Sequence, residues 1–347
     1  MRECGRLGTT QPSFEVAAGT LERLGRVSLS SSTVWRYHKE VTGQLETELE
    51  EEQKPPPYVR QEDLAAMEWV AAHERIEKHA SVSIDGVKVL LRDDGYREVK
   101  MVSVSEVVKE TETEAEPGTI AAGKGEADSA EEDGQGTGCQ EGIKLKRHSY
   151  RAILGDKESF IAILKGELAC RRVRQADKIS AVNDGAEWIW DLVQTYLPER
   201  TLEILDWPHA VENLAKAGKA GLGEGTPEAQ AWLEQRKTEL WNGQLMQVEI
   251  GLYELPMRYK ERGKDIRQVK GYIDQHWKRL QYDRFRAEER PIGSGTVESA
   301  ARNVVSWRMK RGGQRWSSEG ASRMLIALGE IHSNRWDARI QHLAKAA

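Results

Sequence analysis

Three acidic residues stand in sequence contexts that suit metal-dependent cleavage of a phosphodiester. Asp85 and Asp184 each end a short apolar run and precede a glycine, and Glu298 opens a basic stretch with a helical pattern. A strand that ends in Asp-Gly places its carboxylate at the carboxyl edge of a sheet, where open α/β sheets keep their sites. Two such carboxylates and a third acidic ligand can hold two Mg²⁺ ions about 3.5–4 Å apart, beside the attacking and leaving oxygens. The pattern predicts a nuclease or a transposase.

Alternating strand and helix patterns predict the elements that position these carboxylates. Residues 82–91 are rich in β-branched side chains, 93–95 (Asp-Asp-Gly) are typical of a hairpin turn, and 98–104 alternate apolar and polar residues. Further strands are predicted over 179–184 and 201–206, and helices over 157–174 and 187–196. The resulting order, β-β-β-α-β-α-β, is that of an α/β fold with an RNase H-like mixed sheet and flanking helices.

Three other segments interrupt or precede this pattern. Residues 209–290 predict a helical insertion before the segment that carries Glu298. Residues 106–141 hold 11 acidic residues against two lysines and lack apolar periodicity, which predicts a disordered acidic loop, either a solvated spacer or a screen that mimics phosphate. Residues 46–57 pass from glutamates to three prolines, which predicts a stiff linker. The predicted divisions are a helix-turn-helix domain over 1–54, a linker and helix over 55–80, and a catalytic domain over 81–347.

Composition limits the class of protein and its partners. The chain has 347 residues, of which 31% are charged, and a mean hydropathy of −0.65. No apolar stretch approaches the roughly 18–20 residues of a membrane span, and the first residues lack the core of a secretory signal, so we expect a cytoplasmic, nucleoid-associated location without membrane contact. Three widely spaced cysteines indicate neither disulfides nor zinc. The acidic loop has a net charge of −9, whereas the whole chain has a net charge of −5. The rest of the chain is therefore basic, which suits binding to nucleic acid.

Residues 14–24 and 31–39 predict two helices joined by a turn, the shape of a helix-turn-helix. Apolar residues recur at helical spacing from Phe14 to Leu24, residues 25–30 interrupt them, and serines that suit helix capping follow. The second helix of such a unit enters the major groove. The candidate DNA contacts are Ser32, Thr33, Arg36 and Lys39, and the candidate packing residues are Val34, Trp35 and Val41. The alternative is a helical pair that packs without binding DNA.

A basic stretch follows Glu298 and includes Trp307 and Trp316. Cations among aromatic side chains suit the phosphates and unstacked bases of a DNA strand, although a solvated helix face with core tryptophans is the alternative. The candidate DNA contacts here are Arg302, Arg308, Lys310, Arg311 and Arg315.

Four phrases occur in order along the chain: DGAEWIW at 184–190, LDWPHAVEN at 205–213, IGSGTVE at 292–298 and MKRGGQRW at 309–316. Together they resemble the transposases of the Kra-type bacterial insertion sequences, within the DDE superfamily, over residues 13–338. The resemblance implies an RNase H-like core with Asp85, Asp184 and Glu298 as its catalytic, metal-binding triad. It also implies double-stranded DNA as partner and a homo-oligomer that joins two element ends. The chain departs from the family in its acidic loop and in starting almost at the helix-turn-helix; missing N-terminal residues would weaken recognition of element ends.

Asp206 and His209 match the D-x-x-H element of related Mutator-like transposases, which implies an accessory role. Their alternative roles are a helix cap for Asp206 and a buried hydrogen bond for His209. The expected chemistry uses two Mg²⁺ ions, or Mn²⁺, first to cut a DNA strand with water and then to join the freed 3′-hydroxyl to a target. Two alternatives stay open: a DNA-binding remnant or regulator without transposition, and an RNase H-like nuclease.

Overall fold

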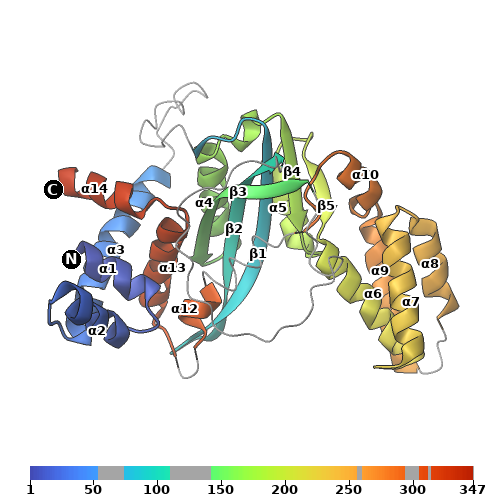
Figure 1. Ribbon diagram of the computed structural model, residues 1–347, viewed down its shortest axis with the longest axis horizontal. Helices are drawn as coiled ribbons and strands as arrows, with labels where there is room; N and C mark the ends of the chain where they lie inside the picture. The colour runs from blue at the N-terminus through green and yellow to red at the C-terminus, as the bar shows by residue number, and fades with distance from the viewer. Residues whose placement is uncertain (54–73, 110–141, 256–259, 294–304, 312–313, 347) are drawn as a thin grey trace.

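The computed structural model describes residues 1–53, 74–109, 142–255, 260–293, 305–311 and 314–346. It is a mixed α/β fold around one five-stranded sheet, consistent with an RNase H-like core (Figure 1). The strands are β1 (His79–Leu91), β2 (Gly95–Lys109), β3 (Ile143–Leu154), β4 (Lys178–Asn183) and β5 (Leu202–Leu205). Their order is β3-β2-β1-β4-β5; the pairs among β1, β2 and β3 are antiparallel, and those among β1, β4 and β5 are parallel.

The predicted hairpin between the first two strands is confirmed, but the strands are longer than expected. Gly95 has a φ of 66°, the left-handed conformation that a tight turn needs and glycine adopts without strain. The acidic loop was predicted from Glu106, whereas β2 continues to Lys109 and pairs with β3 there. Glu106 stays in the sheet because its carboxylate accepts a hydrogen bond from Arg147 Nε at 2.8 Å. The rest of the predicted loop lies outside the described residues.

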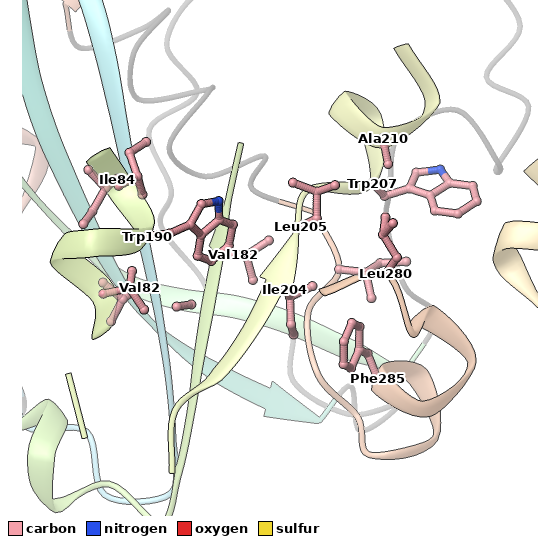
Figure 2. Close-up of a cluster of buried hydrophobic side chains, with 14 of the residues drawn as sticks. Val82, Ile84, Val182, Trp190, Ile204, Leu205, Trp207, Ala210, Leu280 and Phe285 are labelled. Carbon is pink, nitrogen blue, oxygen red and sulfur yellow. The ribbon is translucent and has the colours of Figure 1, made fainter. Parts of the chain in front are cut away.

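Both faces of the sheet are covered. Val82 and Ile84 of β1 pack in one cluster with Trp190 of α5 (Glu187–Tyr196) (Figure 2). Phe160 of α4 (Lys157–Cys170) belongs to the same cluster. Val87 and other residues of the opposite face pack against α13 (Ser318–His332). Successive strand residues point to opposite faces, so Asp85 shares the α13 face with Val87. The helix predicted over 157–174 ends at Cys170, and a 3-10 turn, η3 (Val173–Gln175), follows.

The helical prediction after β5 is confirmed in the described residues. The elements are α6 (Trp207–Leu222), α7 (Pro227–Trp241), α8 (Leu245–Glu254), α9 (Lys260–Gln275), η4 (Trp277–Arg279) and α10 (Tyr282–Ala287). Helices α6 to α9 form an arm that projects from the β5 side of the sheet (Figure 1). The arm is tied to the sheet at its base, where Tyr282 Oη donates to the Leu205 carbonyl at 2.9 Å. None of the helices in the described ranges is long and apolar enough to cross a membrane.

The N-terminal helices pack against the C-terminal ones at the other end of the sheet (Figure 1). They are α1 (Arg2–Thr10), α2 (Phe14–Gly25) and α3 (Ser31–Gln53), beside α12 (Trp307–Met309), α13 and α14 (Trp336–Ala346). The two helices predicted over 14–24 and 31–39 are present as α2 and α3, preceded by an unpredicted helix, and their role as a helix-turn-helix stays a prediction. The linker predicted from Glu46 is wrong over 46–53, which continue α3. The cause is tertiary: Leu45 is fully buried with Trp336, and Arg323 Nε donates to Glu46 Oε2 at 3.0 Å.

Candidate active site

The strand register aligns three carboxylates in one row. The β1–β4 ladder ends at the pair of Val82 with Ala181. Beyond it, Asp85 lies close enough to Asp184 for the two charges to interact. The last β4–β5 pair is Asn183 with Leu205, so Asp184 lies beside Asp206. Side chains in register on neighbouring parallel strands share a face of the sheet. Three carboxylates therefore follow one another across β1, β4 and β5, at the carboxyl edge of β4 and β5.

Asn183 separates β1 from β4 at this level. Its Oδ1 accepts the Ile84 backbone N–H at 2.6 Å, so a side chain replaces the ladder bond that a paired strand would supply. The amide is fully buried, and its Nδ2 has no hydrogen-bond partner among the described residues. Neighbouring parallel strands that part at their carboxyl ends open the crevice in which α/β sheets bind ligands. Asn183 was not predicted from the sequence, where its signal is an amide inside an apolar run.

Asp85 and Asp184 interact electrostatically. Burial, the largest cause, raises the pKa of the Asp85 carboxyl above its usual value, a hydrogen bond from Gly86 N at 2.6 Å opposes this, and the charge of Asp184 raises the pKa further. His209 and Lys310 lower it. Asp184 itself accepts the Ala186 N–H at 2.9 Å, which fixes the turn after β4. The two predicted ligands therefore lie close together. Both carboxylates are partly buried, and a bound cation would offset the repulsion between their negative charges.

Asp206 caps the helix that follows it. It is fully buried, and its Oδ2 accepts the His209 backbone N–H at 3.1 Å and lies 2.8 Å from His209 Nδ1. When Nδ1 carries the proton and donates to Asp206, Nε2 of a neutral His209 is an acceptor. The half-buried imidazole also lies close enough to Asp85 to lower the pKa of that carboxyl. The cap predicted as the alternative for Asp206 is confirmed, and the accessory role of both residues stays a prediction.

Tyr272 brings the helical arm onto the turn at Asp184. Its ring covers Gly185 so closely that a Cβ added there would lie 2.1 Å from Tyr272 Cε2. Its hydroxyl is buried without a hydrogen-bond partner among the described residues. Burial above all, then the charges of Asp184 and Asp206, raise the pKa of this phenol. Tyr272 was missed by the sequence analysis because only the folded arm brings α9 to this turn.

Substitution of Gly185 by alanine should misplace Asp184. The new methyl group meets the aromatic ring rather than a flexible chain end, so we expect a loss of about 1–3 kcal/mol in the free energy of unfolding, with a fall in any activity that needs Asp184. Urea unfolding measures the first effect. The double variant Gly185→Ala/Tyr272→Ala removes the collision and should recover part of the activity; equal activity in the two variants would contradict the close contact.

Glu298 and Arg302 lie outside the described residues, but both ends of their segment approach the carboxylate row. The Ile292 carbonyl accepts the Trp207 N–H at 2.9 Å, next to Asp206. On the other side, Lys310 is close enough to Asp85 to lower its pKa. Within the described ranges, no three His, Cys, Asp or Glu side chains are arranged to hold a metal ion.

The predicted DNA contacts after Glu298 divide into exposed and buried groups. Lys310, Arg311 and Arg315 are exposed, and Arg311 lies 5.2 Å from the centre of the half-exposed Trp307 ring. Arg308 is 1% exposed, and its Nη2 donates to the Gly8 carbonyl at 2.9 Å. The Arg308 guanidinium thus holds α1 in place and does not lie on the outer surface with its neighbours.

The N-terminal half of α3 is partly exposed. Ser32 and Arg36 are exposed, Thr33 Oγ1 lies 2.9 Å from Ser30 Oγ, and Lys39 lies 3.3 Å from Glu319. The packing predicted for Val34 and Val41 is confirmed because both are buried. The packing predicted for Trp35 is wrong: its side chain is 50% exposed, because it follows Val34 on the helix and points away from α1 and α2.

Comparison with known proteins gives little further information. No family model matches the chain, and no curated protein matches its sequence. Among solved structures, the chain is similar to the Drosophila P element transposase strand transfer complex, with 12% sequence identity and a TM-score of 0.30, over 99% of this chain and 79% of that chain. A similarity of this size defines neither a family nor an activity.

Proposed function

We propose that the chain is a transposase of the DDE class, which cuts a DNA strand and joins its 3′ end to a target. The observation that carries this proposal is the row of carboxylates, in which Asp85 and Asp184 act on each other at the place where β1 and β4 part. Perturbed carboxyl groups in such a crevice are typical of catalytic sites. The Kra-type phrases in the sequence favour transposition among the reactions that this site supports.

The donor set fits divalent cations that prefer oxygen. Asp85, Asp184 and Glu298 would hold two Mg²⁺ or Mn²⁺ ions, with Glu298 supplied by a segment whose ends flank the row. When bound, the ions supply charge stabilisation for an in-line displacement at phosphorus. The chain's own residues do the rest: Asn183 and Gly185 set the positions of the Asp85 and Asp184 carboxylates. His209 adds a proton acceptor or donor beside Asp85.

Exposed cations would bind the DNA on both sides of this row. Lys310, Arg311 and Arg315 suit phosphates near the cut. On the partly exposed N-terminal half of α3, the predicted contacts Ser32, Thr33, Arg36 and Lys39 suit a recognition surface. Arg308 is left out because its guanidinium is buried. Joining two element ends to one target would require at least two copies of the chain, so we propose that it acts as a homo-oligomer on DNA in the bacterial nucleoid.

A strand-transfer assay tests the proposal. The full chain is incubated with Mg²⁺, labelled DNA that carries element ends, and a target plasmid. Joined product supports the proposal. Cleavage without joining would instead favour an RNase H-like nuclease, and retarded DNA without either reaction would favour a regulator or an element remnant. Repetition with Mn²⁺ and with EDTA shows whether the reaction needs a divalent ion.

A further inference from the structure

A cavity of about 460 Å³ lies between α3 and the chain around Trp316, away from the carboxylate row. Its walls include Trp35 and Lys39 of α3, Arg92 at the end of β1, and Arg315. From Asp85 to Arg92 the strand rises seven residues, about 23 Å at roughly 3.3 Å per residue. The cavity is therefore a second site, separated from Asp85 by about seven base pairs of duplex at 3.4 Å each.

The walls of this cavity are strongly basic. Five arginine and lysine side chains line it, against the single carboxylate of Glu319. Glu319 already pairs with Lys39 and Arg323, at 3.3 and 3.0 Å. Among the described residues, no ion pair involves Arg92 or Arg315, and both are exposed. His38 adds no charge at neutral pH, since burial and two arginines lower its pKa to about 3. The excess positive charge favours an anion.

Arg308 forms a buried cation in the same wall. Its guanidinium carbon lies 5.2 Å from the centre of the Phe14 ring and 5.1 Å from that of Trp316, and its hydrogen bonds go to the neutral Gly8 carbonyl. No carboxylate within the described ranges forms an ion pair with it. Burial and the charge of Arg311 lower its pKa to about 10. A buried charge without an opposite charge is costly, and an anion in the cavity would offset that cost.

Two indoles give the cavity flat apolar surface beside these cations. Trp35 is half exposed on α3. Trp316 is held against the end of β1, since its carbonyl accepts the Arg92 N–H at 2.9 Å and its Nε1 donates to the Met309 carbonyl at 3.1 Å. Indoles beside cations suit an unstacked base and its phosphate, because every base has a face for stacking. An acidic peptide would use the cations and leave the indoles unmatched.

We propose that this cavity takes one unstacked nucleotide of a DNA strand, with its phosphate on Arg92 and Arg315 and its base against Trp35. This inference rests on the proposed function, since it assigns a second contact to the same DNA. The volume lies within the range of about 300–1,000 Å³ for small-ligand pockets. The site is formed by α3 and by the chain after α12, so it would couple the recognition helix to the catalytic side of the protein.

The test measures binding of oligonucleotides that contain 2-aminopurine, by fluorescence, with the full chain in EDTA so that no cleavage occurs. We expect Arg92→Ala and Arg315→Ala each to reduce the slope of the logarithm of the binding constant against the logarithm of the salt concentration. The reduction should correspond to about one lost phosphate contact. Trp35→Ala should weaken binding about tenfold or more and abolish the fluorescence change that reports stacking. Lys88→Ala, an exposed cation on β1 outside the cavity, and Tyr96→Ala, an exposed aromatic, should bind as the unmodified chain does.

Two further measurements give each outcome a meaning. Adenosine monophosphate and inorganic phosphate are titrated as free anions. The DNA assignment would be overturned if either anion saturated the protein at a lower concentration than the oligonucleotide and if its binding were also weakened by Trp35→Ala. Equal oligonucleotide binding by the Trp35, Arg92 and Arg315 variants would also overturn it, and if strand transfer still occurs the proposed function survives. Conversely, the chain could bind the oligonucleotide in a way that depends on Trp35 and yet neither cut nor join DNA. That result would support the nucleotide site in the cavity and contradict the proposed transposase function.

Discussion

Substitution of Asp184 by asparagine should reduce DNA cleavage and strand transfer by at least about a thousandfold. The change keeps the shape of the side chain and its bond to Ala186 N, but removes a negative charge that the metal site would need. A metal ion contributes several kcal/mol of charge stabilisation, and about 4 kcal/mol corresponds to a factor of roughly 10³. The measurement is the rate of product formation with labelled DNA in Mg²⁺, and Asp85→Asn should behave in the same way.

DNA binding provides the control for these variants. Gel retardation in EDTA should be unchanged in Asp85→Asn and Asp184→Asn, because neither residue belongs to the basic surfaces. Asp206→Ala should lose about 1 kcal/mol of stability with its helix cap and keep part of the activity, since one of its oxygens serves α6 and His209. Full activity from Asp184→Ala would contradict the assignment of this residue as a ligand.

The end of β4 just before Asp184 could be predicted from the sequence, whereas the strand end expected at Asp85 is wrong. The apolar run before Asp184 predicts β4 and the place where it stops, at the carboxyl edge of the sheet. The run before Asp85 predicts the strand but not its end, because β1 pairs with β2 and continues to Leu91. The groups that refine the site could not be predicted in this way: Asn183 acts across the β1–β4 gap, and Tyr272 reaches Gly185 only through the folded arm.

The incorrect predictions share a cause, which is tertiary burial that local composition does not reveal. The glutamates from Glu46 onward have the composition of a solvated linker, yet Leu45 and Leu49 between and before them are buried and keep α3 helical. Arg308 looks like its basic neighbours in sequence, but its helical position turns it toward Gly8. Trp35 is the reverse case, a large apolar residue that the fold leaves half exposed.

Substitution of Glu167 by glutamine should destabilise the whole fold by about 3–5 kcal/mol. Glu167 of α4 is fully enclosed, and its carboxylate receives two hydrogen bonds from Arg335 at 2.8 Å, one from Arg151 Nε at 3.1 Å and one from Ser149 Oγ at 2.6 Å. These donors come from β3 and from the turn between α13 and α14, so one carboxylate joins the sheet to the C-terminal helices. Its removal takes one carboxylate away from two buried arginines. Arg335 keeps Glu74 and Arg151 keeps Glu330, so their charge is then only partly compensated.

The pH dependence separates this charge effect from a packing defect. Burial alone would raise the pKa of Glu167, but Arg335 and Arg151 outweigh it and hold the pKa well below its ordinary value of 4.5. A carboxyl with a lowered folded pKa stabilises the fold above its unfolded pKa, and this stability is lost as the pH falls below about 4.5. The difference in the free energy of unfolding between the unmodified chain and Glu167→Gln should therefore be largest at neutral pH and shrink in acid.

Urea unfolding at a series of pH values from 7 to about 3 measures this difference. The matched control is Glu224→Gln, at a carboxylate that is 83% exposed and 3.5 Å from Lys219 Nζ. Such surface pairs contribute at most about 1 kcal/mol, so its curve should follow that of the unmodified chain. If Glu167→Gln lowered stability by the same amount at every pH, the loss would come from packing around α4 rather than from charge. The ion pairs would then not be what holds the C-terminal helices, and with them Lys310, against the sheet that carries Asp85.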